Sequence, residues 1–248
     1  MRARGKAPRK KIVSRERAQA KIDEWFVGVT EQAFRAAVEL KLAVGVAEGD
    51  YRFKNADERL QVLEGALRFF REFSSKVIEL SDGRCVYFAP DVRARNRGID
   101  NAMAWAEYAI HAVTSSGRRI VGKDYWERLF NPVKLDSLDL IESIIRREDC
   151  FATVNDGHPE RDCIIFVGAS KDGRRLEIVT RLDEFGNVNA DLTEVTVVVT
   201  RKRGETTNPP SRPLTEVVEA VAQHQAAGFS PSTDVSSIAN ESDADKSE

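Results

Sequence analysis

Four short segments rich in apolar and β-branched residues constrain the fold more than any other part of the chain. They cover residues 150–155, 162–170, 174–183 and 192–201. Lys171-Asp172-Gly173-Arg174 joins the second segment to the third. An Asp-Gly pair between apolar runs favours a hairpin, because both central residues tolerate positive φ. We therefore expect an antiparallel sheet that buries one face under helices.

Helical patterns precede and follow this sheet. Apolar residues recur three and four positions apart, as on one face of an α-helix, over residues 14–26, 30–45, 57–73, 99–113, 138–146 and 213–227. The sequence also predicts a second Asp-Gly hairpin over residues 76–88 and a short helix near residues 124–130. The expected fold class is therefore α+β, with a helical N-terminal part followed by an antiparallel β-sheet packed on helices.

Charge is distributed unevenly along the chain. The 38 Lys and Arg residues nearly balance the 40 Asp and Glu residues, for a net charge of −2. Residues 1–21 nevertheless hold nine basic residues and one Glu, a net of +8, whereas residues 230–248 hold five acidic residues and one Lys, a net of −4. Basic arms commonly touch nucleic acid or another polyanion, although both ends would also suit solvated tails.

These patterns predict five regions in chain order. We expect a disordered basic arm at 1–13, a helical N-terminal region at 14–75, an α+β domain with the antiparallel sheet at 76–204, a C-terminal helix at 211–228 and a disordered acidic tail at 229–248.

Several classes of protein are not indicated. Cys85, Cys150 and Cys163 form no CxxC pair, and their odd number argues against a disulfide framework. The sequence contains no apolar run long enough to span a bilayer and no secretory h-region, so we expect no membrane contact and a cytoplasmic location. It also has no dinucleotide fingerprint, phosphate loop, nucleophile elbow or zinc spacing, so no cofactor or metal is expected.

His111 is the strongest candidate for acid–base chemistry. It falls near the C-terminal end of the predicted helix 99–113, and Arg118, Arg119 and Lys123 follow within twelve residues. An imidazole beside cations suits a general acid or base acting on a phosphate. The alternative is a half-buried His that packs on the sheet, with the basic residues on a solvated loop. His158 lies in a charged turn and is interpreted as solvated, and His224 as a surface residue.

Thr180 and Arg181 fall on opposite faces of the predicted strand 174–183, because side chains alternate along a strand. The Thr180 hydroxyl would interrupt an apolar face and could belong to a site on the sheet. Arg181 shares the other face with Glu177, and a salt bridge between them is the simpler explanation of both charges.

Two further groups of basic residues suit nucleic acid. Arg9, Lys10 and Lys11 belong to the N-terminal arm, and Lys123 follows the predicted helix 99–113. The run Arg93, Arg95 and Arg97 comes soon after Tyr87 and Phe88, and aromatic and basic side chains together bind single strands by stacking and charge. Aromatic residues in a hairpin are also common core residues.

The order of features over residues 99–201 resembles the barnase–EndoU–colicin–RelE superfamily of small metal-independent RNases, whose members include phage-associated proteins. The matching residues are Ala109-Ile110-His111-Ala112, the helix 138–146, the strand and turn 164–173, and Ile178-Val179-Thr180. The resemblance covers about two-fifths of the chain and rests on element order. It implies that His111, Arg118, Arg119, Thr180 and Arg181 would be the catalytic residues.

Two functions therefore remain open at this point, and the sequence leaves undecided whether the protein is an enzyme. The first is a non-enzymatic accessory protein, of phage or mobile-element origin, that binds RNA, DNA or a protein partner through its basic arm and Arg-rich loop. The alternative is an RNase that cleaves by transesterification at the 2′-OH, which needs a base, an acid and cations on the phosphate.

Overall fold

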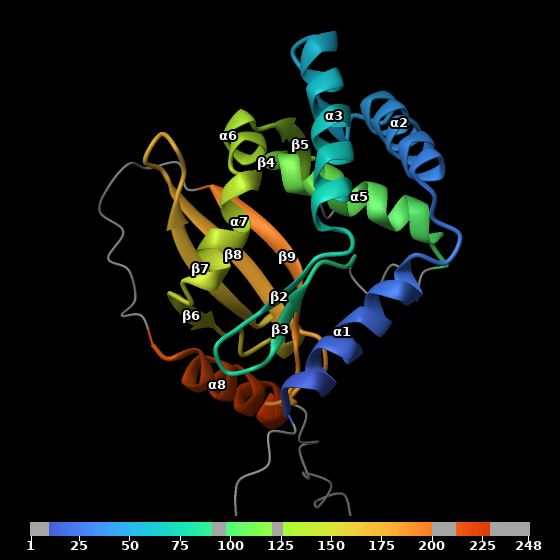
Figure 1. Ribbon diagram of the computed structural model, residues 1–248. Helices are drawn as coiled ribbons and strands as arrows, with labels where there is room; N and C mark the ends of the chain where they lie inside the picture. The colour runs from blue at the N-terminus through green and yellow to red at the C-terminus, as the bar shows by residue number, and fades with distance from the viewer. Residues whose placement is uncertain (1–9, 91–97, 121–125, 200–211, 229–248) are drawn as a thin grey trace, which may run out of the picture.

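The structure, a computed structural model, describes residues 10–90, 98–120, 126–199 and 212–228 and confirms the α+β class. Helices from the N-terminal part gather beside and above a twisted sheet, with α7 on one face of the sheet and α8 below it (Figure 1). The helices are α1 (Lys10–Trp25), α2 (Glu31–Ala47), α3 (Ala56–Phe73), α5 (Asn101–Val113), α6 (Pro132–Asp136), α7 (Ile141–Arg146) and α8 (Leu214–Gly228), with single 3-10 turns η1 (Leu138–Leu140) and η2 (Pro159–Arg161).

Side-chain caps explain where several helices begin. Thr30, Asn55 and Asp100 precede α2, α3 and α5, and each accepts a hydrogen bond from the backbone N–H three residues ahead. Asn131 caps α6 in a similar way, with Pro132 at the first helical position. The α1 helix begins at Lys10, four residues before the expected start at Ser14, and therefore includes the end of the predicted arm.

The main sheet has six strands. Their order across the sheet is β2 (Val77–Glu79), β3 (Cys85–Tyr87), β9 (Leu192–Val199), β8 (Arg175–Leu182), β7 (Cys163–Ala169) and β6 (Cys150–Thr153). All neighbouring strands are antiparallel except β3 and β9, which run parallel through the pair Val86 and Leu192. The antiparallel pairs β2–β3 and β7–β8 confirm both hairpins. Gly83 and Gly173 have φ of 88° and 78°, whereas Asp82 and Asp172 do not take positive φ, so only the second central residue of each turn has the expected conformation.

A second, three-stranded sheet corrects the prediction for residues 114–130. Its order is β1 (Tyr51–Arg52), β5 (Trp126–Phe130) and β4 (Thr114–Arg119). The short helix expected near residues 124–130 was wrong, and residues 115–119 form a strand instead of a helix end and loop. β4 and β5 pair antiparallel through Ser115 and Leu129, and β5 also pairs with β1, so strand pairing overrides the weak helical pattern.

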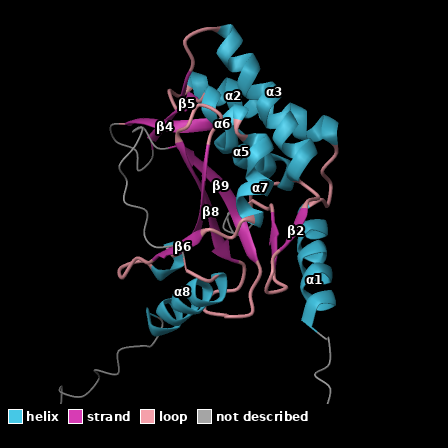
Figure 2. Ribbon diagram, turned by 60° about the vertical axis from the view of Figure 1, so that its left-hand side comes forward, coloured by secondary structure: helices cyan, strands magenta, loops and turns pink. Residues whose placement is uncertain are grey.

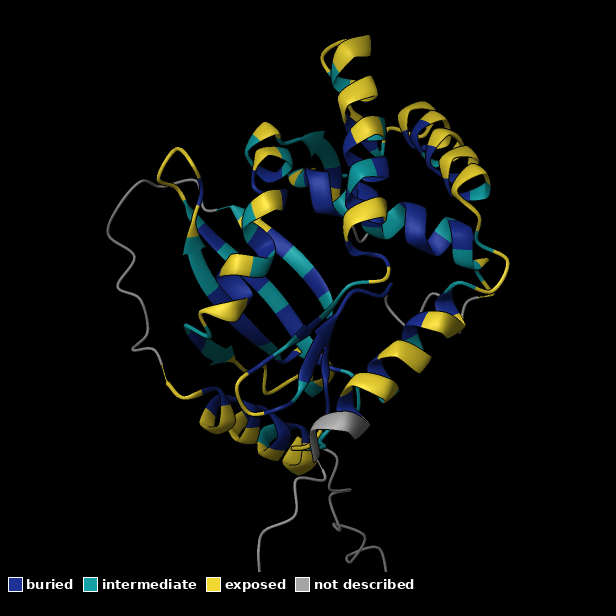
Figure 3. Cartoon of the chain, in the orientation of Figure 1, coloured by how far each residue is buried: buried dark blue, intermediate teal, exposed yellow. Residues whose placement is uncertain are grey.

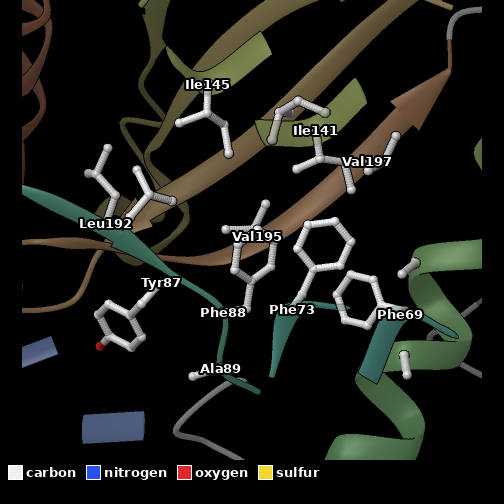
Figure 4. Close-up of a cluster of buried hydrophobic side chains, with 14 of the residues drawn as sticks. Phe69, Phe73, Tyr87, Phe88, Ala89, Ile141, Ile145, Leu192, Val195 and Val197 are labelled. Carbon is white, nitrogen blue, oxygen red and sulfur yellow. The ribbon is translucent and has the colours of Figure 1, made fainter. Parts of the chain in front are cut away.

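The core lies between the sheet and the helices on one of its faces (Figures 1 and 3). Phe69 and Phe73 of α3 contact Phe88, with ring centroids 6.1 and 4.6 Å apart. Figure 4 shows these rings with Ile141 of α7 and Val195 of β9 on the same side of the sheet. All five side chains are buried, and burying each one fully stabilises the fold by roughly 1.5–3 kcal/mol.

The buried carboxylate of Asp191 attaches α1 to the sheet. It accepts hydrogen bonds from the Ser14 hydroxyl, from the Cys85 backbone N–H at 2.9 Å, and from Nε and Nη2 of Arg17 at 3.0 and 2.9 Å. Figure 2 shows α1 beside the β2 edge of the sheet and α8 below β6, both toward the lower end of the molecule. Within the described residues, no helix is both long and apolar enough to cross a membrane.

Candidate functional site

His111 belongs to a group of basic side chains that we call the His111 cluster, made of Lys41, His111, Arg128 and Lys134. They come from α2, the last turn of α5, β5 and α6. The Lys134 ammonium is buried and donates a hydrogen bond to the His111 carbonyl oxygen at 3.2 Å. The Lys41 ammonium pairs with Glu107 at 3.2 Å, and His111 and Arg128 are partly exposed. Among the residues that the structure describes, three cations thus lie near the Glu107 carboxylate at a partly open surface.

The electrostatics of this cluster keep His111 neutral. Burial lowers the pKa of His111 well below its usual range, and the charges of Arg128, Lys134 and Lys41 act in the same direction. Burial also lowers the pKa of Lys134 to about 7, with a further contribution from Arg128. At neutral pH the site therefore presents a neutral imidazole, an arginine and an ammonium that is close to its titration point.

The structure pairs His111 with different cations from the predicted ones. Arg118 lies on β4, where its Nε contacts the buried Glu127 carboxylate at 3.2 Å, and it has no interaction with His111 among the described residues. Arg119 ends β4, but its side chain lies outside the described set, as does Lys123. Arg128 and Lys134 were not predicted, because the β4–β5 hairpin that brings Arg128 beside α5 was itself missed.

Thr180 and Arg181 are not brought to the His111 cluster. The Thr180 side chain is buried on the core face of β8, as the alternation predicted, and its hydroxyl donates to the Ile164 carbonyl at 2.9 Å. Arg181 lies on the other face, where it pairs with Glu194 at 3.2 Å and not with Glu177. Glu177 instead pairs with Arg175 at 2.8 Å, so the expected Glu177–Arg181 salt bridge was wrong.

Most of the predicted nucleic-acid contacts lie outside the described residues. Arg9, Arg93, Arg95, Arg97 and Lys123 belong to the ranges that the structure does not describe. Lys10 and Lys11 begin α1, but their side chains are also outside the described set. Tyr87 and Phe88, the aromatic residues expected to act with the Arg93–Arg97 run, are core residues. Their side chains are 4% and 0% exposed.

His224 is not the isolated surface residue that the sequence suggested. Its Nδ1 lies 2.7 Å from the buried Asp162 carboxylate, and its Nε2 lies 3.0 Å from Asp156. The two carboxylates raise the pKa of His224 and hold the loop before β7 against α8. The Asp162 carboxylate also accepts from the backbone N–H of Asn155 at 2.8 Å, so the group serves as a structural anchor.

The exposed His158 contacts Glu160 at 3.1 Å, as expected for a charged turn. Across the part of the chain that the structure describes, no three His, Cys, Asp or Glu side chains are grouped so that they could hold a metal ion.

Comparison with family models, curated proteins and solved structures found no match to this chain.

Proposed function

We propose that this chain is a non-enzymatic accessory protein that binds nucleic acid, with the His111 cluster holding backbone phosphates. The observation that supports this is the excess of positive charge in the cluster, where, among the described residues, Lys41, Arg128 and Lys134 share the nearby carboxylate of Glu107. Within the described residues, the Arg128 side chain forms no ion pair and no hydrogen bond.

A phosphate would relieve the unfavourable electrostatics of this cluster. Burial lowers the pKa of both Arg128 and Lys134, which means that their cationic forms lack a sufficient counter-charge. Charge-assisted contacts from the guanidinium and ammonium groups of the cluster to neighbouring backbone phosphodiesters supply that counter-charge. The interaction is sequence-independent, because it reads only the nucleic-acid backbone.

The test is fluorescence anisotropy of labelled single-stranded RNA and DNA with the full chain. Three phosphate contacts predict a slope of log affinity against log salt near −2, or roughly a twentyfold loss between about 50 and 200 mM salt. Arg128→Gln should weaken binding and reduce the magnitude of that slope by about 0.7. Arg35→Gln is the matched control, since Arg35 is an exposed cation on α2 paired with Glu39.

Wild-type affinity in Arg128→Gln would refute the assignment of the phosphate site. Deleting residues 1–9 leaves α1 intact and tests the separate contribution of the basic arm. A protein that loses all binding on that deletion, and none in Arg128→Gln, binds through the arm alone.

RNA cleavage is the second candidate, and one observation favours it. A neutral, partly exposed His111 beside Arg128 and Lys134 matches the needs of transesterification at a 2′-OH. His111 would accept the hydroxyl proton, Arg128 would bind the phosphate, and Lys134, with its pKa near 7, would donate to the leaving oxygen. Thr180 and Arg181 have no part in this arrangement.

Cleavage of varied RNAs is measured in EDTA, with His111→Ala and Lys134→Met as variants. The RNase hypothesis predicts metal-independent products with cyclic phosphate ends and loss of cleavage by roughly 100-fold or more in each variant. Wild-type protein that binds RNA without cutting it would eliminate the RNase and leave the binding function.

A further inference from the structure

His224 of α8 contacts a carboxylate with each of its two ring nitrogens. Nδ1 lies 2.7 Å from Oδ2 of Asp162, and Nε2 lies 3.0 Å from Oδ1 of Asp156. An ionised carboxylate only accepts hydrogen bonds, so both nitrogens must carry a proton for both contacts to form. The arrangement therefore requires the imidazolium. A neutral imidazole, with a single N–H, can donate to only one of the two carboxylates.

The two carboxylates differ in their access to water. The side chain of Asp162 is 0% exposed, and its Oδ1 already accepts from the backbone N–H of Asn155 at 2.8 Å. The side chain of Asp156 is 98% exposed. Water can replace a hydrogen bond lost at Asp156 but not one lost at Asp162, and an unpaired buried carboxylate is the more unfavourable outcome. When His224 loses one proton, the other should therefore stay on Nδ1.

Loss of the Nε2 proton turns the contact with Asp156 from attractive to repulsive. The bare nitrogen presents a lone pair to the carboxylate, so that two acceptors face each other. Among the described residues, the Asp156 side chain has no other hydrogen bond or ion pair. The base of its turn stays fixed, because the Asn155 carbonyl accepts from the His158 N–H at 3.0 Å. Only the tip of the turn, at residues 156–157, thus depends on the state of His224.

The other charged groups around His224 do not take the place of these two carboxylates. α8 packs on β6, β7 and η2 below the sheet (Figure 1), and neither strand carries a charged side chain. The charged side chains of η2, its turn and the β8–β9 connection pair elsewhere: His158 with Glu160 at 3.1 Å, Arg161 with Glu160 at 3.9 Å, and Lys21 with Glu184 at 3.2 Å. Within the described residues, the charges that act on His224 are those of its two carboxylate partners, and they raise its pKa.

The next residue of α8 places this contact beside a cleft. Gln225 donates to the Pro159 carbonyl at 3.3 Å and accepts from the Gly186 N–H at 2.8 Å, so α8 joins the turn before β7 to the β8–β9 connection. Gln225 and Glu160 also line a cleft of about 390 Å³. The turn that contacts His224 is therefore next to the rim of this cleft.

We propose that His224 and Asp156 form a pH-sensitive latch, which holds the tip of the turn against α8 when His224 is protonated and releases it when His224 is neutral. Asp162 keeps its hydrogen bond in both states, so the anchor remains while the tip moves. Because the contact favours the protonated form, the latch is closed below about pH 6.5 and opens as the pH rises through the pKa of His224 in the folded protein. The latch shares no residue with the His111 cluster and does not depend on the proposed nucleic-acid function.

Spin-label EPR at residue 157 of the full chain tests the latch. The φ of Gly157 is not positive, and a Cβ there would lie 3.7 Å from its nearest neighbour, Oδ1 of Asn155, so Gly157→Cys should fold. The chain without this substitution, labelled in the same way, gives the background from the native cysteines. Between about pH 5.5 and 9, the ratio of mobile to immobile label should rise about two- to fivefold, as expected for the loss of one exposed ion pair.

Three variants, each combined with Gly157→Cys, make the test specific. Asp156→Ala removes the contact at an exposed position, so the label should be mobile at both pH values. His224→Gln should also abolish the pH response, and Asp156→Ala decides the matter if that variant fails to fold. His158→Gln is the matched control, because His158 is an imidazole of the same turn that pairs with Glu160 instead, and it should keep the full response.

NMR of the 15N-labelled imidazoles locates the remaining proton of His224 above the transition, which should lie on Nδ1. A proton on Nε2 would overturn the proposal. So would label mobility that is equal at the two pH values in the otherwise wild-type chain, a response that survives in His224→Gln or Asp156→Ala, or one that disappears in His158→Gln.

Discussion

Replacing Asp191 by Asn tests how strongly one buried carboxylate holds α1 to the sheet. Oδ1 accepts from Ser14 and from the Cys85 N–H, and Oδ2 accepts two hydrogen bonds from the Arg17 guanidinium. Asparagine is nearly the same size and keeps an oxygen for Ser14 and Cys85. Its NH2 group then faces Arg17, so that two donors meet where a bidentate ion pair was formed.

The expected loss of stability is large because the Asp191 carboxylate is excluded from solvent. Asp191 is 0% exposed, whereas the Arg17 side chain is 29% exposed and retains some solvation when its partner is lost. Breaking a buried charge pair by removing one partner costs about 3–5 kcal/mol. Since Arg17 stays partly solvated, we expect Asp191→Asn to lower the free energy of unfolding by about 3 kcal/mol, at the lower end of that range.

Urea unfolding at neutral pH, followed by circular dichroism, measures the effect. A loss of about 3 kcal/mol corresponds to a fall of roughly 6–12 °C in the melting temperature of a chain of this size. Glu39→Gln is the control, since its exposed pair with Arg35 on α2 should contribute only about 0.3–0.5 kcal/mol. A loss below about 1 kcal/mol in Asp191→Asn would show that α1 is held mainly by apolar contacts.

Two predictions concern pH. The pKa of Lys134 falls to about 7 in the folded protein, so above that pH the unfolded chain binds more protons and the free energy of unfolding rises with pH. Urea titrations should therefore find Lys134→Met more stable than wild type near pH 7, and the difference in stability should narrow toward about pH 10. Asp162 and Asp156 raise the pKa of His224, so its contribution to stability is complete below about pH 6.5, the pKa in the unfolded chain, and is lost as the pH rises through the pKa in the folded protein. His224→Gln should therefore lose more stability at about pH 5.5 than at about pH 8.5.

Local signals in the sequence were sufficient for much of the fold. The two Asp-Gly turns need positive φ at Gly83 and Gly173, and this requirement is visible in the sequence itself. The alternation around Thr180 likewise predicted which residues of β8 face the core. The segment 114–130 could not be predicted in the same way, because Gly117 fits there through its close approach to Leu129, a contact between strands that no local pattern encodes.

The sequence predicted His111 but not its neighbours, again because contacts between distant segments leave no local pattern. His111 stood out because histidines are rare in this chain and it falls at a helix end. Its actual neighbours, Arg128 and Lys134, depend on the missed hairpin and on how α6 packs under α5. The partner of His224 lies 62 residues away, so nothing near it in the sequence could indicate the contact with Asp162. Sequence order identifies reactive side chains more readily than it identifies their partners.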